Sequence, residues 1–275
     1  MPFIETDDGS SLFYKDWGTG EPVLFVHGWV LGADMWEYQM TPLATQGLRC
    51  IAYDLRGASR SDQPGHGYDP DSLAGDLAAV IQQLDLHGVT LVGHSMGSAQ
   101  IVRYLSRHHA DRDRVARAAF VATTLPFLLK TDDNPDGLDG AVFEETLAAV
   151  GEDRPRFAAG VADLWFGNGL PGVSVSPELQ QWLIGLFMQA SPRAAVEMFR
   201  AFTQTDFRLD LAAVAVPTLI IHGNSDAMAP FEISARKAAA AIPHSHLTLY
   251  HNASHGLFLS HRQRLNADLI EFIKR

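Results

Sequence analysis

The sequence is poor in cysteine and in positive charge, and both shortages narrow the possible functions. Cys50 is the one cysteine in 275 residues, so no disulfide can form within the chain. This cysteine usage fits a reducing compartment. The chain has 21 Lys and Arg against 32 Asp and Glu, a formal net charge of −11. Binding to nucleic acids or anionic membranes needs a basic surface, so we expect neither kind of partner.

Long apolar runs and targeting signals are also missing. No run approaches the roughly 18 apolar residues that span a bilayer, so we expect no membrane insertion. The opening residues, MPFIETDDGS, have neither the basic nor the apolar region of a secretory signal. Together with the single cysteine, this predicts a cytoplasmic protein. Nothing in the sequence indicates an oligomeric state.

Motifs for several other chemistries do not occur. There is no phosphate-binding GxxxxGK[ST] loop, and Gly18-Thr19-Gly20 lacks the third glycine of a dinucleotide-binding fingerprint. The sequence has no HExxH motif and no paired cysteines at metal-binding spacing. We therefore expect neither a metal nor a cofactor.

What the sequence does contain is an alternation of short apolar runs with amphipathic stretches. A hairpin around Asp8-Gly9 comes first. Continuous apolar runs, typical of strands buried on both faces of a parallel sheet, follow at 23–26, 49–53, 89–92, 118–122, 218–221 and 246–250. Helical periods lie between or after them, at 73–84 (with Asp71 or Ser72 as the expected N-cap), 98–107, 231–241 and 265–273. This pattern predicts a doubly wound, mostly parallel eight-stranded α/β sheet.

Residues 125–212 break the alternation. They hold a loop-like cluster at 132–140 and helix-like stretches at 143–150 and 177–187. Because such sheets place their sites at the carboxyl ends of the strands, we interpret this segment as a helical cap. It would be inserted in a core formed by residues 1–124 and 213–275. The alternative is an ordinary helical layer.

The strongest chemical signal is Gly93-His94-Ser95-Met96-Gly97, which lies between an apolar run and a helical period. This is the strand–turn–helix context of a nucleophile elbow, where a sharp turn raises a serine above the sheet. Residues two before and two after that serine must be small, and both are glycine. Ser95 is therefore the predicted nucleophile, and the alternative is a turn with a buried hydroxyl. We expect His94 to point elsewhere and to pack.

A serine hydroxyl needs a base, and the base needs an orienting carboxylate. In this kind of sheet the chain order is Ser, acid, His. Asp226 follows the apolar run at 218–221, and His255 follows the run at 246–250. Asp226 and His255 are therefore the predicted acid and base, although Asp226 could instead be a turn residue.

An oxyanion hole needs two backbone N–H groups aimed at the developing charge. Met96 directly follows the predicted nucleophile, and Trp29 lies in the loop after the run at 23–26. These two residues are the predicted donors. In the segment 125–212, Trp165 and Phe166 are candidates for an apolar substrate pocket, with simple packing as the alternative.

These residues resemble the α/β-hydrolase superfamily and, within it, the cofactor-free (non-haem) haloperoxidase, perhydrolase and esterase group. The resemblance runs nearly end to end, and its segments include FVHGW at 25–29, YDLRG at 53–57, SMG at 95–97, LLKTD at 128–132, TDF at 205–207 and LNADL at 265–269. It implies a triad of Ser95, Asp226 and His255, with Trp29 and Met96 at the oxyanion hole.

One departure from the group concerns the residue after the tryptophan. The group usually has proline there, and that proline is associated with peroxyacid formation. This sequence has Val30. Val30 is therefore a third candidate pocket residue, and it argues against efficient perhydrolysis.

The sequence thus predicts a serine hydrolase that cleaves small esters or lactones through an acyl-enzyme on Ser95. The substrate is expected to be uncharged, because a net charge of −11 repels anions at long range. Two alternatives stay open. One is a haloperoxidase or perhydrolase that makes peracids at the same serine, and the other is a non-catalytic receptor for a small ligand on the same fold.

Overall fold

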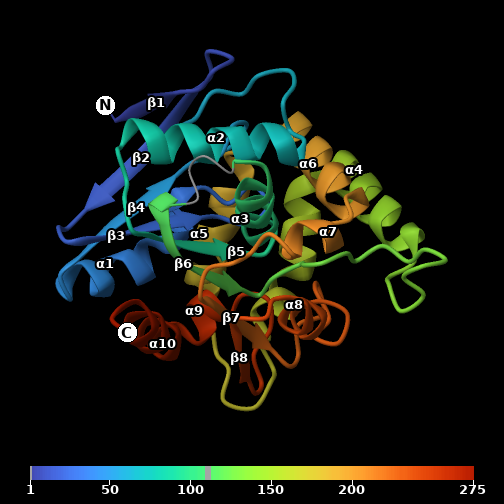
Figure 1. Ribbon diagram of the computed structural model, residues 1–275. Coiled ribbons are helices and arrows are strands. Elements are labelled where there is room, and N and C mark those ends of the chain that lie inside the picture. The colour runs from blue at the N-terminus through green and yellow to red at the C-terminus, as the bar shows by residue number, and fades with distance from the viewer. Residues whose placement is uncertain (1, 109–112) are drawn as a thin grey trace.

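The computed structural model, shown in Figure 1, describes residues 2–108 and 113–275. Their strands form one eight-stranded sheet in the order β1-β2-β4-β3-β5-β6-β7-β8. The strands are β1 (Phe3–Glu5), β2 (Ser11–Trp17), β3 (Glu21–Val26), β4 (Leu48–Tyr53), β5 (Val89–His94), β6 (Val115–Val121), β7 (Thr218–Gly223) and β8 (Ser245–Tyr250). β2 pairs antiparallel with β1 and β4, and the remaining neighbours pair parallel. The predicted doubly wound, mostly parallel sheet is confirmed.

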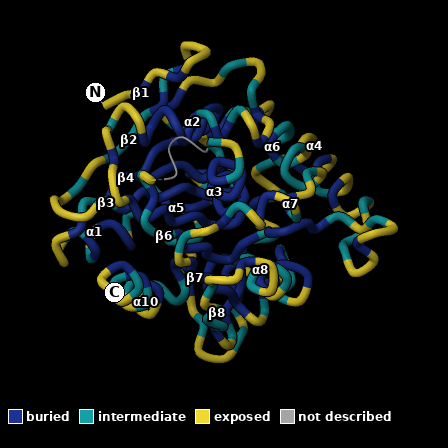
Figure 2. Tube along the Cα trace, in the orientation of Figure 1, coloured by how far each residue is buried: buried dark blue, intermediate teal, exposed yellow. Residues whose placement is uncertain are grey.

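The central strands are buried because helices cover both faces of the sheet. Every residue of β5 and β7 is buried, as the dark blue strands of Figure 2 show. α2 (Pro70–Gln83) and α3 (Met96–Arg107) pack together on one side, and α1 (Glu37–Thr45) and α10 (Arg262–Ile273) pack together on the other (Figure 1). Apolar residues on both faces of a strand therefore find partners, which explains the continuous apolar runs in the sequence.

The starts of α2 and α8 differ from the sequence expectation for local reasons. The N-cap of α2 is Asp69, whose carboxylate accepts the N–H groups of Asp71 and Ser72. Proline at the next position fits, because its missing N–H is one that a first helical turn leaves unpaired. α8 (Ala235–Ala241) begins four residues later than expected, since Ser234 has φ −115° and ψ −100° and cannot lie within a helix.

Four helices lie between β6 and β7, and we call the first three the inserted helices: α4 (Gly140–Phe166), α5 (Pro177–Met188) and α6 (Pro192–Gln204). α4 packs against both α5 and α6, and α4 and α6 lie together at the right of Figure 1. Asp153 bends α4, with φ −150° and ψ 82°, two residues before Pro155. α6 and the second half of α4 were not predicted. The short elements η1 (Ala33–Trp36), α7 (Arg208–Leu211) and α9 (Leu257–Ser260) complete the described secondary structure.

Candidate active site

Ser95 lies at the junction of β5 and α3 with φ 53° and ψ −120°, a conformation that costs energy for any residue other than glycine. The neighbouring glycines make this turn possible. A Cβ atom on Gly97 would lie 2.5 Å from the carbonyl oxygen of Val26, and one on Gly93 would lie 2.7 Å from the carbonyl carbon of Gly97. In both cases the atom that a Cβ would meet belongs to the main chain, which cannot move aside easily. This is the local geometry of the nucleophile elbow that the sequence predicts.

A chain of two hydrogen bonds joins the three predicted residues. The Oγ atom of Ser95 is 2.9 Å from Nε2 of His255, and Nδ1 of His255 is 2.8 Å from Oδ2 of Asp226. Because an ionised carboxylate only accepts, Nδ1 carries the proton, which leaves the Nε2 lone pair facing the serine hydroxyl. All three side chains are buried. The structure thus brings Ser95, His255 and Asp226 together after β5, β8 and β7.

The Asp226 carboxylate is held from both sides. Its Oδ1 accepts the backbone N–H groups of Met228 and Ala229, both at 2.9 Å. Burial alone would raise the pKa of Asp226, but the charge and hydrogen bond of His255, the nearby His222 and the N–H of Ala229 together lower it below its ordinary value. Asp226 is therefore a fixed negative charge, oriented by the main chain and directed at His255.

Both predicted oxyanion donors border the same cavity as Ser95. Met96 is the first residue of α3, where a backbone N–H has no intrahelical carbonyl to bind. Trp29 follows β3, and its indole Nε1–H donates to the carbonyl of Ala195 in α6 at 2.8 Å. Its ring packs against Phe187 and Phe199, with centroids 5.1 Å and 4.7 Å away. The loop that carries the Trp29 N–H is thus fixed to the inserted helices.

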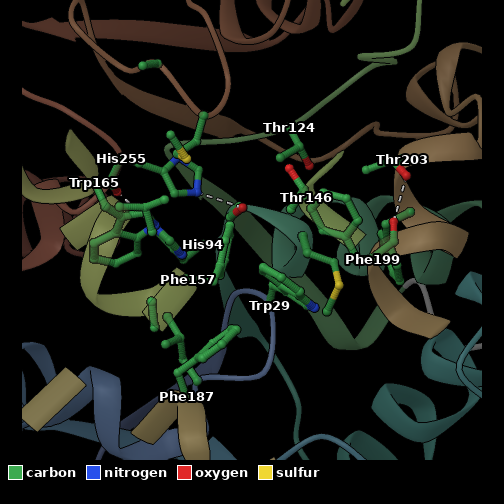
Figure 3. A pocket seen from close by; sticks show the side chains of 18 of the residues that line it. Trp29, His94, Thr124, Thr146, Phe157, Trp165, Phe187, Phe199, Thr203 and His255 are labelled. Carbon is green, nitrogen blue, oxygen red and sulfur yellow. Dashed lines mark hydrogen bonds between the residues drawn. The ribbon is translucent and has the colours of Figure 1, made fainter. Parts of the chain in front are cut away.

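The cavity beside Ser95 has a volume of about 290 Å³ and is seen from close by in Figure 3. Trp165 and Phe166, both proposed from the sequence, line it. Its described lining includes no Asp, Glu, Lys or Arg. The cavity lining includes Trp29, Leu31, His94, Met96, Thr124, Leu128, Phe143, Thr146, Phe157, Leu183, Ile184, Phe187, Phe199, Phe202, Thr203, Met228 and His255.

Two expectations about individual residues are corrected. Val30 was expected to line the pocket, but it is completely buried, and the cavity touches Trp29 and Leu31 on either side of it without touching Val30. Its φ of 47° turns the chain at this point. His94 was expected to point elsewhere, yet its ring lines the cavity and lies 4.9 Å from the ring of His255.

Most of the aromatic lining was not identified from the sequence. Phe157, Phe187 and Phe199 come from three different inserted helices, and the cavity forms only where these helices meet. Helical spacing offered a partial signal, because Phe157 lies eight residues before Trp165 and thus on a similar face of α4. Nothing in the linear sequence indicated that these faces converge on Ser95.

Other reactive side chains lie outside this arrangement. Cys50 is buried in β4, and burial raises the pKa of its thiol to about 12. Within the described residues, no group of three or more His, Cys, Asp or Glu side chains is placed to hold a metal ion. The same residues include no helix long and apolar enough to cross a bilayer.

Comparisons with known proteins agree with this geometry. Residues 21–262 match the family described as the alpha/beta hydrolase fold. The whole chain is 41% identical to the entire non-heme haloperoxidase of Rhodococcus erythropolis and 38% identical to the entire bifunctional esterase/perhydrolase DCH of Acinetobacter calcoaceticus. The crystal structure of a bromoperoxidase from Bacillus anthracis superimposes with a TM-score of 0.95 at 38% identity, covering 100% of this chain and 99% of that one. The chain therefore belongs to the α/β-hydrolase fold family, in the group of non-heme haloperoxidases and esterases.

Proposed function

We propose that this protein is a serine hydrolase that cleaves small, uncharged carboxylic esters or lactones through an acyl-enzyme on Ser95. One observation carries the proposal. The hydrogen-bond chain from Asp226 through His255 to Ser95 ends at a cavity whose described lining has no charged carboxylate, ammonium or guanidinium group. A nucleophile, its base and the orienter of that base are thus present at the wall of an apolar pocket.

Acylation follows from the proton positions. His255 accepts the Ser95 proton at Nε2 while Oγ attacks the ester carbonyl, and the imidazolium that forms is stabilised by the Asp226 carboxylate. The negative oxygen of the tetrahedral intermediate binds the N–H groups of Met96 and Trp29. His255 then donates its proton to the departing alkoxide, which leaves an acyl group on Ser95.

Deacylation repeats these steps with water. His255 accepts a proton from a water molecule, the hydroxide attacks the acyl carbonyl, and the same two N–H groups hold the oxyanion. Return of the proton to Oγ of Ser95 frees the carboxylic acid. In a lactone the alcohol and the acid are one molecule, so a single hydroxy acid leaves.

The cavity supports the choice of substrate class. A volume of about 290 Å³ corresponds to roughly ten water molecules at ~30 Å³ each, which suits a small substrate. A charged substrate would lose its hydration without gaining an ionic partner on the described walls, which is costly. The net charge of −11 adds long-range repulsion of anions.

Perhydrolysis is a second candidate, favoured by the named activities of the haloperoxidase and esterase/perhydrolase relatives. Hydrogen peroxide would replace water in the attack on the acyl-enzyme and release a peracid. The peracid would then oxidise bromide to hypobromite and return to the carboxylic acid. This route requires a carboxylate, so halogenation with peroxide and bromide but without acetate would contradict it.

A panel of p-nitrophenyl esters, lactones and amides, assayed with the wild type and Ser95→Ala, tests the proposed function. Hydrolysis of short neutral esters or lactones should be lost in Ser95→Ala, and a fluorophosphonate probe should label the wild type at Ser95 only. Full activity in Ser95→Ala would refute the acyl-enzyme. An unlabelled wild type without hydrolysis would instead favour a ligand receptor.

A further inference from the structure

His94 makes a contact that the proposed mechanism does not use. It is the last residue of β5, directly before Ser95, and its Nε2 atom is 3.0 Å from the main-chain carbonyl oxygen of His255. A carbonyl oxygen only accepts, so His94 carries its proton on Nε2 and donates it to His255. The residue before the nucleophile thus binds the backbone of the residue that serves as base.

We propose that His94 is a positioning residue, which holds His255 by its main chain so that Nε2 of His255 stays in line with Oγ of Ser95. This inference rests on the proposed function, because it assigns His94 a part in the same reaction. The distance of 2.9 Å between the base and Ser95 depends on where the His255 backbone lies. A displacement of that backbone by ~1 Å is enough to cost about 100-fold in rate.

The surrounding loop explains why such a tie is needed. Ser254 donates its hydroxyl proton to the carbonyl of Leu164 at 2.7 Å, and the N–H of Gly256 donates to the carbonyl of Trp165 at 2.7 Å. Both bonds attach the neighbours of His255 to the last turn of α4, an inserted helix. The bond from His94 attaches His255 itself to the sheet that carries Ser95. It therefore fixes the base relative to the nucleophile rather than relative to α4.

The energetic cost of burying a histidine with one unpaired ring nitrogen supports a functional role for His94. Among the described residues, the buried Nδ1 atom of His94 has no hydrogen-bond partner. It faces Gly28, since a Cβ atom there would lie 2.5 Å from it. The ring sits among aromatic side chains, with centroids 5.1 Å from Phe258 and 5.8 Å from Trp165. A phenylalanine would suit these neighbours and remove the unpaired Nδ1, but it would leave the carbonyl oxygen of His255 without the donor that His94 supplies.

His94 does not serve as a second base. Burial first, and then the nearby His255, lower the pKa of His94 to about 3. The ring therefore stays neutral over the pH range of ester hydrolysis, and its Nε2 proton remains available to the carbonyl.

Three substitutions of His94 separate the hydrogen bond from the packing. His94→Phe keeps a planar ring and removes the donor. His94→Gln places an amide N–H near the position of Nε2, whereas His94→Asn, its matched control, has the same amide but reaches only as far as Nδ1. We expect kcat for p-nitrophenyl acetate to fall between ~10-fold and ~100-fold in His94→Phe and His94→Asn. In His94→Gln most of that loss should be recovered.

The remaining readouts distinguish positioning from structure. The loss should be larger in kcat than in KM, because the bond from His94 to His255 acts on the reacting base, whereas the ring contributes only part of the cavity wall. The melting temperature of His94→Phe should stay close to that of the wild type, because the loss of the bond to His255 is offset by removal of the unpaired Nδ1. Its kcat should nevertheless be lower. The proposal is overturned if Gln gives no more activity than Asn, or if the loss of kcat in each variant follows a loss of thermal stability.

An NMR measurement keeps this test separate from the proposed function. The Nδ1 proton of His255, bound to Asp226, gives a downfield resonance that requires no substrate. It should be retained in His94→Gln and exchange-broadened in His94→Phe and His94→Asn. If the wild type cleaves no ester, the proposed function fails, while this resonance still decides whether His94 orders His255. An unchanged resonance in all three variants overturns the positioning role.

Discussion

Replacement of Asp226 by asparagine tests the hydrogen-bond chain most directly, because the main chain dictates how the new amide must lie. Oδ1 of Asp226 accepts the N–H groups of Met228 and Ala229. The asparagine oxygen must remain on these two donors, so its NH₂ group takes the place of Oδ2. That position is 2.8 Å from Nδ1 of His255. The imidazole must then accept at Nδ1 and carry its proton on Nε2, facing Ser95.

In this tautomer His255 cannot accept the serine proton. In serine proteases the same substitution of the triad aspartate lowers kcat about 10⁴-fold, which corresponds to ~5 kcal/mol of transition-state stabilisation. We expect a loss of similar size here. The fold should survive, because asparagine has nearly the same shape as aspartate and leaves no buried charge unpaired.

The assay is stopped-flow hydrolysis of p-nitrophenyl acetate, in which the burst of p-nitrophenol reports acylation. Labelling of Ser95 by a fluorophosphonate should slow in parallel. Asp54→Asn is a matched control: Asp54 is also buried but accepts from the Ala33 N–H and from Arg60. Asp54→Asn should lower the stability of the fold, but its turnover per folded molecule should stay within a few fold of the wild-type value. If Asp226→Asn acylates within tenfold of the wild type, the tautomer argument is wrong.

Three further predictions concern the backbone and the buried histidine. Gly97→Ala should destabilise the fold by ~1–3 kcal/mol or more, because its Cβ meets the Val26 carbonyl at 2.5 Å. Gly185→Ala, at an exposed position of α5 with open space around it, should instead stabilise the fold by about 0.5–1 kcal/mol. Urea unfolding measures both. The pKa of His94 is about 3 in the fold against 6.5 unfolded, so the unfolded chain binds this proton first, and stability that is complete above about pH 6.5 is lost as the pH falls. Between about pH 7 and about pH 5 the wild type should lose ~2 kcal/mol of its free energy of unfolding through His94. In His94→Phe the change in the free energy of unfolding between these two pH values should be smaller by this amount. Val30→Pro should lower kcat/KM for ester hydrolysis by ~10-fold or more, since proline cannot adopt a φ of 47° and must displace the Trp29 N–H; unchanged kinetics would show that this N–H is not an oxyanion donor.

The sheet and the three side chains of the hydrogen-bonded chain could be predicted from the sequence, because each depends on local pattern. Buried parallel strands need apolar residues on both faces, so they appear as continuous runs. The turn at Ser95 needs glycines two positions away on each side, because a Cβ atom at either position would clash with main-chain atoms. Asp226 and His255 lie in the loops that follow β7 and β8, and this position together with the chain order Ser, acid, His distinguished them from the other acids and histidines.

The cavity and the role of His94 could not be predicted in this way. Phe157, Phe187 and Phe199 meet only because α4, α5 and α6 converge on one cavity, and aromatic residues at helical spacing are equally typical of simple packing. His94 precedes Ser95 by one residue, but its partner is 161 residues further along the chain. A hydrogen bond to a main-chain carbonyl leaves no requirement on the side chain of the partner and therefore no pattern in the sequence.

The inserted helices have two tasks in this fold, and the contacts imply that these tasks cannot be separated. They line the cavity, and they also bind the loop that carries His255, the proposed base, and the loop that carries Trp29, a proposed oxyanion donor. Ser254 and Gly256 bind the end of α4, and the Trp29 indole binds the Ala195 carbonyl of α6. A substitution that moves α4 or α6 to admit a larger substrate should therefore also move the base or an oxyanion donor. Changes of specificity in this chain should cost kcat unless they alter only side chains that face the cavity, such as Phe157.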